Sequence, residues 1–340
     1  MTHLDYITEH PPNASVPLGS LDGTSLAQDR VYLRNSFPSP EPGRVTGEIQ
    51  VLIPGRAPAT LTPDRLAAMS QVTIDMVLEC AGNGRSLMDP VPDGLPWGLG
   101  GVSPIRVGGV RLGEALGAIP REVVDVVFTG MDRGEVWPEG EVEYQFSIDA
   151  ELARSGTPML VTHLGGEPLS HDHGGPVRLM VPGHYAMKSV KWLTAIEGRA
   201  EPFAGHFVER YRYFGDDETE EGAPVGAIRV RSVIARPEEG SRLPTGTVVV
   251  KGSAWSGAGQ VTKVEVSTDL GRTWEVSDLA PGASETAASV WSIELTLAAG
   301  HHTIIARATD ASGHTQPIRP PWNKRGYGNN LAHRVGIEVV

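Results

Sequence analysis

The chain has 340 residues, of which 40% are hydrophobic, and this length and composition predict about two folded domains. The net charge of −12 argues against a nucleic-acid partner, because nonspecific binding to phosphates requires a basic surface. A single cysteine excludes an internal disulfide framework, and no run approaches the ~18 consecutive apolar residues that a membrane span needs.

The N-terminal segment has neither a basic start nor an apolar stretch, so it does not match a secretory signal. We therefore expect a cytoplasmic protein, or a periplasmic one if an export signal has been removed. The 41 glycines and 27 prolines, together with scarce helical periodicity, favour a β-rich fold with long, shaped loops.

Short strands and loops alternate along the first half of the chain. Residues 1–30 are polar and predict an extended surface arm, and residues 47–53 (GEIQVLI) predict a strand. Thr62, followed by a proline, is typical of the N-cap of a short helix. The alternating run VTIDMVLE (72–79) predicts a second strand that ends at Cys80, a common place for a functional group held by a rigid scaffold.

Residues 81–111 contain eight glycines and four prolines, which predict a long irregular loop. Because this stretch also carries tryptophan, leucine and isoleucine, we expect the loop to be packed and functional. Beyond it, the pattern predicts a short amphipathic helix over 112–119 and strands over 123–130, 158–164 and 188–197.

An acidic stretch, GDDETEEGAPVG (215–226), predicts a domain boundary, which we place between residues 1–218 and 219–340. After it, short alternating segments separated by turn residues are typical of a β-sandwich. The sequence therefore predicts an α+β, β-rich protein whose second domain is a sandwich.

Cys80 is open to several interpretations when it is taken by itself. A lone cysteine is usually a buried, inert hydrophobe. The small-residue turn after it and the nearby Arg85 favour a reachable thiolate, which would be a nucleophile or a soft metal ligand. Together with His163, His171 and His173 it suggests a zinc-dependent hydrolase, although the spacing matches no usual zinc pattern.

A cluster of basic residues stands out in this acidic chain. Arg178, Lys188 and Lys191 lie close together in the sequence, with Ser189 between them. Guanidinium and ammonium groups in such a cluster would hold a phosphate-bearing cofactor. The alternative is an ordinary solvated strand edge.

Several motifs occur in order: YLRNSFPSP, ECAGNGRS, FTGMD, GEPLSHDHGGPVRLMVPG with KSVKWL, GSAWSGAG, VEVSTDLGRTW and PPWNKRGYGNNLAHRVGIEV. As a set they resemble the sulfite oxidase family of molybdenum-pterin oxidoreductases, from about Val31 to the C-terminus. The resemblance implies a molybdopterin-binding catalytic domain over 1–218 and an immunoglobulin-like dimerisation domain over 219–340. It also implies an enzyme that carries the molybdenum–molybdopterin cofactor and forms a homodimer.

The resemblance assigns Cys80 as the thiolate ligand of molybdenum, and a soft ligand suits such a sulfur-rich site. Ser36 departs from the family, whose members commonly have histidine there. The residues implied to hold the cofactor are Arg34, Asn35, Ser36, Asp132, His173, Arg178, Lys188, Ser189, Val190 and Lys191.

The family's substrate pocket implies further roles. Arg34 and Arg85 match family arginines and are expected to orient an anion and stabilise its charge, and His163 is expected to handle protons.

Three positions depart from the family on the substrate side. Counting back without gaps from the DHG motif puts the family's active-site tyrosine at Thr162, while Gln260 replaces an arginine and Val107 a tryptophan. A pocket short of a phenol and a guanidinium is expected to bind a dianion less well, since each charge-assisted contact contributes roughly 1.5 to 3 kcal/mol.

Oxygen-atom transfer is the chemistry that the resemblance implies, with a small oxyanion as substrate and oxidation of sulfite to sulfate as the leading expectation. Reduction of S-oxides, N-oxides or another oxyanion at the same site is the alternative. A zinc-dependent hydrolase and a noncatalytic binding module are the remaining ones. No haem-attachment motif is present in the sequence, so we expect electrons to leave to a separate protein such as a cytochrome.

Overall fold

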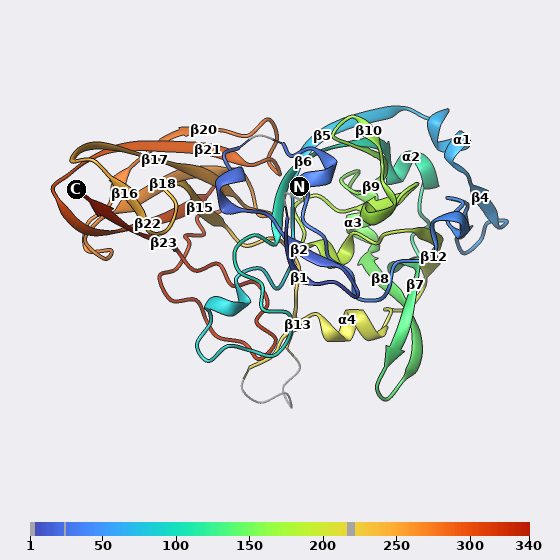
Figure 1. Cartoon of the computed structure of the whole chain (residues 1–340). Helices are drawn as coiled ribbons and strands as arrows, with labels where there is room; N and C mark the ends of the chain where they lie inside the picture. Colours follow the sequence, from blue (N-terminus) through green and yellow to red (C-terminus); the bar gives the residue numbers. More distant parts are fainter. Residues whose placement is uncertain (1–3, 24, 216–221) are drawn as a thin grey trace.

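The computed structural model describes residues 4–23, 25–215 and 222–340, which form the two lobes of Figure 1. The first lobe contains the α-helices and two sheets, and the second is built from strands. The expected α+β, β-rich fold is confirmed. The expected boundary between residues 218 and 219 lies outside the described residues. In the part of the chain that the structure describes, no helix is long and apolar enough to cross a membrane.

Two five-stranded sheets form the first lobe. One has the order β10-β9-β6-β5, with β11 also paired to β9, and the other has the order β4-β3-β12-β7-β8. Aliphatic side chains from both sheets are buried in one core. The strands are β3 (Ile49–Leu52), β4 (Ala59–Leu61), β5 (Gln71–Glu79), β6 (Val102–Arg111), β7 (Asp125–Val136), β8 (Gly140–Asp149), β9 (Met159–Leu164), β10 (Glu167–Pro168), β11 (Arg178–Met180) and β12 (Leu193–Arg199).

The α-helices of the described chain are short and lie in connections between strands. Thr62 caps the first one as expected, because its Oγ1 accepts a hydrogen bond from the Arg65 backbone N–H at 3.2 Å. The expected amphipathic helix over 112–119 ends early, at Leu116. The helices are α1 (Pro63–Ala67), α2 (Leu112–Leu116), α3 (Ala150–Arg154) and α4 (His206–Arg210), and the remaining strands of this part are β1 (Asp5–Thr8), β2 (Asn13–Ser15), β13 (Arg212–Tyr213) and β14 (Ala223–Pro224).

The second lobe is the expected sandwich. A four-stranded sheet in the order β15-β17-β21-β20 faces a five-stranded sheet in the order β16-β23-β22-β18-β19, and a second apolar core draws only on this lobe. The strands are β15 (Arg231–Arg236), β16 (Ser241–Leu243), β17 (Gly246–Trp255), β18 (Val261–Ser267), β19 (Glu275–Val276), β20 (Asp278–Ala280), β21 (Ser289–Leu297), β22 (Gly300–Asp310) and β23 (His333–Val339).

The prediction of an irregular loop over 81–111 was wrong for its last third. Residues 102–111 form β6, which pairs with β5 and β9. Pro104 cannot donate a backbone hydrogen bond, and the structure accommodates it. Its carbonyl accepts from the Leu26 N–H of the N-terminal arm at 2.9 Å, and the N–H of its partner Val77 donates in the opposite direction, to the Thr286 carbonyl at 2.9 Å. The backbone nitrogen of Pro104 thus faces away from β5, and no hydrogen bond between β5 and β6 is lost. The proline is therefore tolerated inside a paired strand.

Two other predictions need correction. The expected strand over 188–197 begins only at Leu193, because Trp192 has a φ of 45° and the residues before it are irregular. The N-terminal arm is more than a surface wrap, since Val16, Leu21 and Leu26 are buried. The Leu21 carbonyl also accepts a hydrogen bond from Ser253 Oγ of the second lobe at 2.8 Å. The arm thus joins the two lobes.

Candidate functional site

Cys80 follows the last residue of β5, at the start of a tight turn. Its backbone N–H donates to the Gly101 carbonyl at 2.8 Å, and its carbonyl accepts from the Asn83 N–H at 2.9 Å. Gly84 takes a φ of 85°, a left-handed conformation that favours glycine. The thiol is only 7% exposed, yet Cys80 lines two adjoining cavities. The sequence prediction that this turn presents a functional group is consistent with that position.

The first cavity lies in the first lobe. It gathers most of the residues that the resemblance implied for the cofactor, although they come from segments far apart in the chain. We call it the cofactor cavity. Its lining is Tyr32, Arg34, Asn35, Ser36, Leu78, Cys80, Ala81, Asp132, Tyr144, His173, Arg178, Ala186, Met187, Ser189, Lys191 and Tyr211.

Arg178 lies at the start of β11 with its guanidinium buried in the wall of this cavity. Nη1 donates to the His173 carbonyl at 2.9 Å and Nη2 to the Ser189 carbonyl at 2.7 Å, which holds the guanidinium in one orientation. Burial lowers the pKa of Arg178 to about 10, so the side chain is still a cation at neutral pH. Its Nε is among the buried atoms of the described chain that lack a hydrogen-bond partner.

Lys191 contributes a second cation. Its Nζ donates to the Asp172 carbonyl at 2.9 Å, contacts Asn35 Oδ1 and lies 4.2 Å from the Trp192 ring centroid. Burial, and then the neighbouring Arg178, lower the pKa of Lys191 to about 7. An anion bound here would favour the charged form of Lys191.

Two further titratable groups face the same cavity. Burial raises the pKa of Asp132 to about 6, and its Oδ1 has no partner among the described residues. Burial lowers the pKa of His173 to about 3, so the imidazole is neutral at pH 7. Because the Gln28 carbonyl can only accept, His173 Nε2 carries the proton in their 2.9 Å hydrogen bond. Nδ1 is therefore the unprotonated, accepting nitrogen.

A phosphate-bearing heterocycle fits this set of groups. Arg178 and Lys191 can neutralise a phosphate, and Asp132 and His173 can accept hydrogen bonds from ring or amino N–H groups. The unpartnered Asp132 Oδ1 and Arg178 Nε are the kind of buried polar atoms that require a partner. The residues present thus fit a molybdopterin.

Two of the residues expected at the cofactor do not line the cavity. Val190 is buried, and its carbonyl accepts from the Leu179 N–H at 2.9 Å. Lys188 is partly buried, and burial lowers its pKa. Both flank Ser189, whose Oγ accepts from the Val181 N–H at 3.1 Å, so they shape the loop that carries Ser189 and Lys191.

The second cavity adjoins the first and shares Arg34, Cys80 and Tyr211 with it. Among the described residues, five basic side chains and one carboxylate line it. We call it the anion cavity. Its lining is Arg34, Cys80, Gly82, Arg85, Asp93, Gly94, Leu95, Trp97, Arg210, Tyr211, Lys324, Arg325 and Tyr327.

Arg85 is held rigidly in the wall of the anion cavity. Its Nε donates to the Arg325 carbonyl at 3.0 Å and its Nη1 to the Leu95 carbonyl at 2.8 Å. Its Cζ lies 5.4 Å from the centre of the Tyr327 ring. The guanidinium packs directly on Gly82, where a Cβ would come within 2.8 Å of Nη2. Arg85 therefore presents a fixed positive charge close to Cys80.

The structure places the other expected substrate residues away from both cavities. Thr162 and His163 lie on β9, where Thr162 Oγ1 and His163 Nδ1 are 2.9 Å apart and the His163 residue is exposed. Gln260 lies at the edge of the sandwich and donates to the Gly282 carbonyl at 3.2 Å. Val107 is fully buried within β6. None of the four lines either cavity.

Phenols and further basic groups line the two cavities from other segments of the chain. Tyr211, at the C-terminal end of α4, lines both cavities together with Arg34 and Cys80. Arg210, Lys324 and Arg325 also line the anion cavity. Thr162, which the gapless count selected, lines neither cavity. The motif PPWNKRGYGNN was noted in the sequence, but nothing local indicated that it reaches Cys80.

A zinc site finds no support in the described chain. No group of three or more histidine, cysteine, aspartate or glutamate side chains is placed there so that it could hold a metal ion. His173 uses Nε2 to bond the Gln28 carbonyl, and His163 faces away from the cavities.

Comparisons with known proteins agree with this geometry. Residues 41–207 match the model of the oxidoreductase molybdopterin binding domain, and residues 224–340 match that of the Mo-co oxidoreductase dimerisation domain. The mitochondrial sulfite oxidase of Rattus norvegicus is 31% identical over 362 residues, covering 98% of this chain, which spans 65% of that protein's length. The sulfite oxidase of Gallus gallus is 32% identical over 353 residues, covering 96% of this chain and 76% of that protein.

A solved structure shares the fold of the whole chain. The crystal structure of the sulfane dehydrogenase SoxCD from Paracoccus pantotrophus superimposes with a TM-score of 0.86 at 22% identity, covering 99% of this chain and 88% of that chain. Matches to both domain models and a long alignment above 30% identity place the chain in one family. The chain belongs to the sulfite oxidase family of molybdopterin oxidoreductases.

Proposed function

We propose that this protein oxidises sulfite to sulfate at a molybdenum–molybdopterin cofactor and passes the electrons to an external acceptor. The observation that carries the proposal is the anion cavity, in which Arg34, Cys80 and Tyr211 also line the cofactor cavity. A small anion held there would lie next to the thiol expected to bind the metal. Sulfite carries one to two negative charges near neutral pH and suits this cavity.

The charge of the anion cavity favours an oxyanion over a neutral substrate. Among the described basic lining residues, Arg34 and Arg85 lie nearest to Cys80 in the sequence motifs and can donate to a bound anion. Charge-assisted hydrogen bonds from these guanidinium groups are stronger to an anion than to a neutral S-oxide or N-oxide. This supports oxyanion oxidation over reduction of a neutral oxide, which is the second candidate function.

The cofactor would be held by the residues of the cofactor cavity. Cys80 would supply the thiolate ligand of molybdenum, while Arg178 and Lys191 would neutralise the phosphate. His173 Nδ1 and the Asp132 carboxylate would accept hydrogen bonds from the pterin. When bound, this cofactor supplies the oxygen atom and takes up the electron pair from sulfur.

The chain's own side chains would orient the substrate. Arg34 and Arg85 would bind the sulfite oxygens and aim the sulfur lone pair toward the metal, and the Tyr211 hydroxyl can donate a further hydrogen bond. The net reaction converts sulfite and one water into sulfate, two protons and two electrons. Since the electrons leave singly or as a pair to another molecule, a partner such as a cytochrome completes the cycle.

We propose that the active protein is a homodimer formed through its second domain, in line with the match of that domain to a dimerisation model. Sedimentation equilibrium should give about twice the chain mass of 36.3 kDa. A mass near 36.3 kDa at micromolar concentration would contradict the dimer.

The proposed function can be tested with purified protein from a host that makes the cofactor. We expect about one molybdenum per chain and sulfite-dependent reduction of ferricyanide or cytochrome c. Cys80→Ser should abolish turnover because an alcohol is a poor ligand for this metal, while the protein still folds. The matched control is wild-type protein from a culture grown with tungstate, which has the same amino-acid sequence and carries tungsten in place of molybdenum. Molybdenum without sulfite turnover would contradict the substrate, and zinc or no metal would contradict the cofactor.

A further inference from the structure

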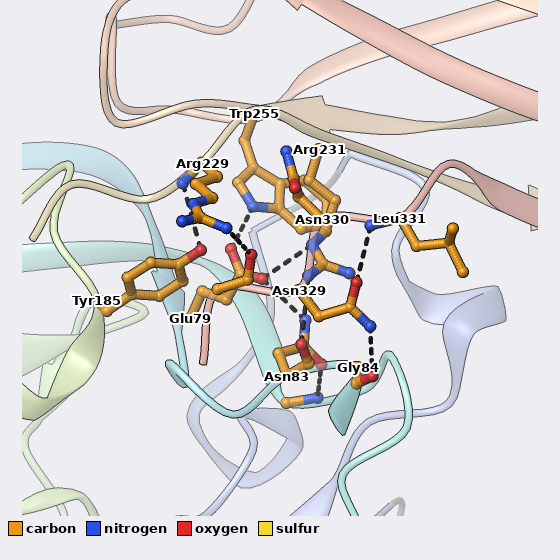
Figure 2. A network of polar contacts seen from close by, with 12 residues as sticks. Glu79, Asn83, Gly84, Tyr185, Arg229, Arg231, Trp255, Asn329, Asn330 and Leu331 are labelled. Carbon is orange, nitrogen blue, oxygen red and sulfur yellow. Dashed lines mark hydrogen bonds and ion pairs between the residues drawn. The ribbon is translucent and has the colours of Figure 1, made fainter. Parts of the chain in front are cut away.

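The second domain holds the turn that carries Cys80 through hydrogen bonds and an ion pair to a buried carboxylate, which belongs to the residue just before Cys80. Glu79, the last residue of β5, is fully buried. Its Oε2 accepts from Trp255 Nε1 at 2.7 Å, and its Oε1 accepts from Asn83 Nδ2 at 3.0 Å and pairs with Arg231 Nε at 3.0 Å. Figure 2 shows these side chains converging on Glu79 from both domains.

Arg231 and Trp255 contact this carboxylate from two neighbouring strands of one sheet. They lie directly opposite each other in the ladder between β15 and β17, and both are about 1% exposed. Two buried side chains fixed on paired strands cannot follow Glu79 if it moves. The sheet of the second domain therefore sets the position of the residue next to Cys80.

The same domain also holds the turn beyond Cys80. Arg231 Nη2 donates to the Asn83 carbonyl at 3.3 Å, and Asn329 Nδ2 donates to the Gly84 carbonyl at 2.6 Å (Figure 2). The Gly328 N–H donates to the Ala81 carbonyl at 2.8 Å. Contacts from residues between 231 and 329 thus hold the chain on both sides of the thiol.

The ion pair also removes an electrostatic problem. An isolated carboxylate in the interior is strongly unfavourable, and the Arg231 guanidinium, whose Nε lies 3.0 Å from Glu79 Oε1 without meeting hydrogen-bond geometry, offsets this charge inside the protein. No other described cation forms an ion pair with Glu79. Removing Arg231 would leave the buried Glu79 carboxylate without its ionic partner and the Asn83 carbonyl without the Nη2 donor, and both losses would loosen the turn.

We infer that Glu79 and Arg231 are positioning residues that lock the Cys80 thiolate in place from the second domain, so that this domain contributes to the metal site as well as to association. The inference rests on the proposed role of Cys80 as metal ligand. It predicts that a change more than 145 residues away in sequence, Arg231→Met, loosens the turn without touching either cavity.

The experiment uses Cys80 as its own reporter, because it is the only cysteine of the chain. Cofactor-free protein is alkylated with iodoacetamide at one fixed pH, and the alkylation rates of the variants are compared with that of the wild type as a measure of access to the thiol. We expect Arg231→Met to raise this rate at least tenfold. The double variant Glu79→Gln/Arg231→Met should return it most of the way, since a neutral amide can still accept from Trp255 Nε1.

Arg307→Met is the matched control. Arg307 pairs with Glu265 at 3.1 Å within the sandwich, away from the turn, so its loss should leave the alkylation rate unchanged. Trp255→Phe, which deletes the Nε1 donor and keeps an aromatic ring at this position, replaces Arg231→Met if that variant does not fold. Equal rates in wild type and in the variants at Arg231 and Trp255 would overturn the inference, as would an equal rise in Arg307→Met.

The cofactor-loaded protein supplies a second readout. We expect the molybdenum content per chain to fall in Arg231→Met and to recover in the double variant. Because alkylation needs neither molybdenum nor sulfite, a wild type that fails to oxidise sulfite would contradict the proposed function alone. Faster alkylation with an unchanged molybdenum content would contradict the positioning role alone.

Discussion

Gly82 provides the sharpest test of the anion cavity, because its missing side chain makes room for Arg85. A Cβ on Gly82 would lie 2.8 Å from Arg85 Nη2 and 2.9 Å from both Cζ and Nη1. Real Cβ atoms do not approach so closely, and the guanidinium is tied to the Arg325 and Leu95 carbonyls at 3.0 and 2.8 Å. Gly82→Ala must therefore displace Arg85 and break at least one of these bonds.

The magnitude follows from the contact that the displaced guanidinium would lose. A hydrogen bond between a guanidinium and an anion contributes roughly 1.5 to 3 kcal/mol. At about 1.4 kcal/mol per factor of ten, kcat/KM for sulfite should fall by about 10- to 150-fold. Steady-state rates with ferricyanide, normalised to molybdenum content, measure this directly, and competitive inhibition by sulfate should weaken in parallel.

Gly98 offers a matched control in the same loop. A Cβ on Gly98 meets no atom within 4 Å, so Gly98→Ala should retain the kcat/KM of the wild type. If Gly82→Ala also retains it at full molybdenum content, Arg85 does not bind the substrate and the assignment of the anion cavity fails.

Three further predictions concern the charged groups of the cavities. His173 has a pKa of about 3 in the folded protein and about 6.5 when unfolded, so the stability it contributes is complete above pH 6.5 and is lost as the pH falls toward 3. Between pH 7 and pH 5 the free energy of unfolding of His173→Gln, measured in urea, should therefore fall by about 2 kcal/mol less than that of the wild type. An equal fall in both proteins would contradict a buried neutral imidazole. Lys191→Met should stabilise the cofactor-free protein at pH 7. The folded-state pKa of Lys191, about 7, lies below that of an exposed lysine, so this lysine lowers the free energy of unfolding until the pH exceeds about 10.5. The same variant should bind less molybdenum, and a higher molybdenum content would contradict phosphate binding by Lys191. Finally, the KM for sulfite should rise severalfold between about 20 and 300 mM salt, since the basic lining attracts the anion through a screened field; a KM independent of salt would contradict electrostatic capture.

Features that depend on neighbouring residues could be predicted from the sequence. The end of β5 at Cys80, the cap of α1 at Thr62 and the strands of the sandwich follow from alternation, turn residues and capping preferences, all of which act within a few residues. Ordered motifs also indicated Arg34, Asp132, His173 and Arg178, which the structure brings into one cavity.

Other features could not be predicted, because packing decided them. Pro104 and the glycines around it indicate a loop by local preference, yet pairing with β5 and β9 makes a strand of this segment. Thr162 matched a gapless count, but it lies on β9 and lines neither cavity, whereas Tyr211 lines both.

The turn that carries Cys80 separates what the sequence determines from what the tertiary structure determines. The sequence by itself determined that a lone thiol ends a strand and enters a glycine-rich turn. Only the tertiary structure decided that Arg231 and Arg325 reach this turn from the far end of the chain, since no local preference encodes a contact across more than 140 residues. The contact of Arg231 forms because a buried carboxylate requires a cation, and the fold places one within reach.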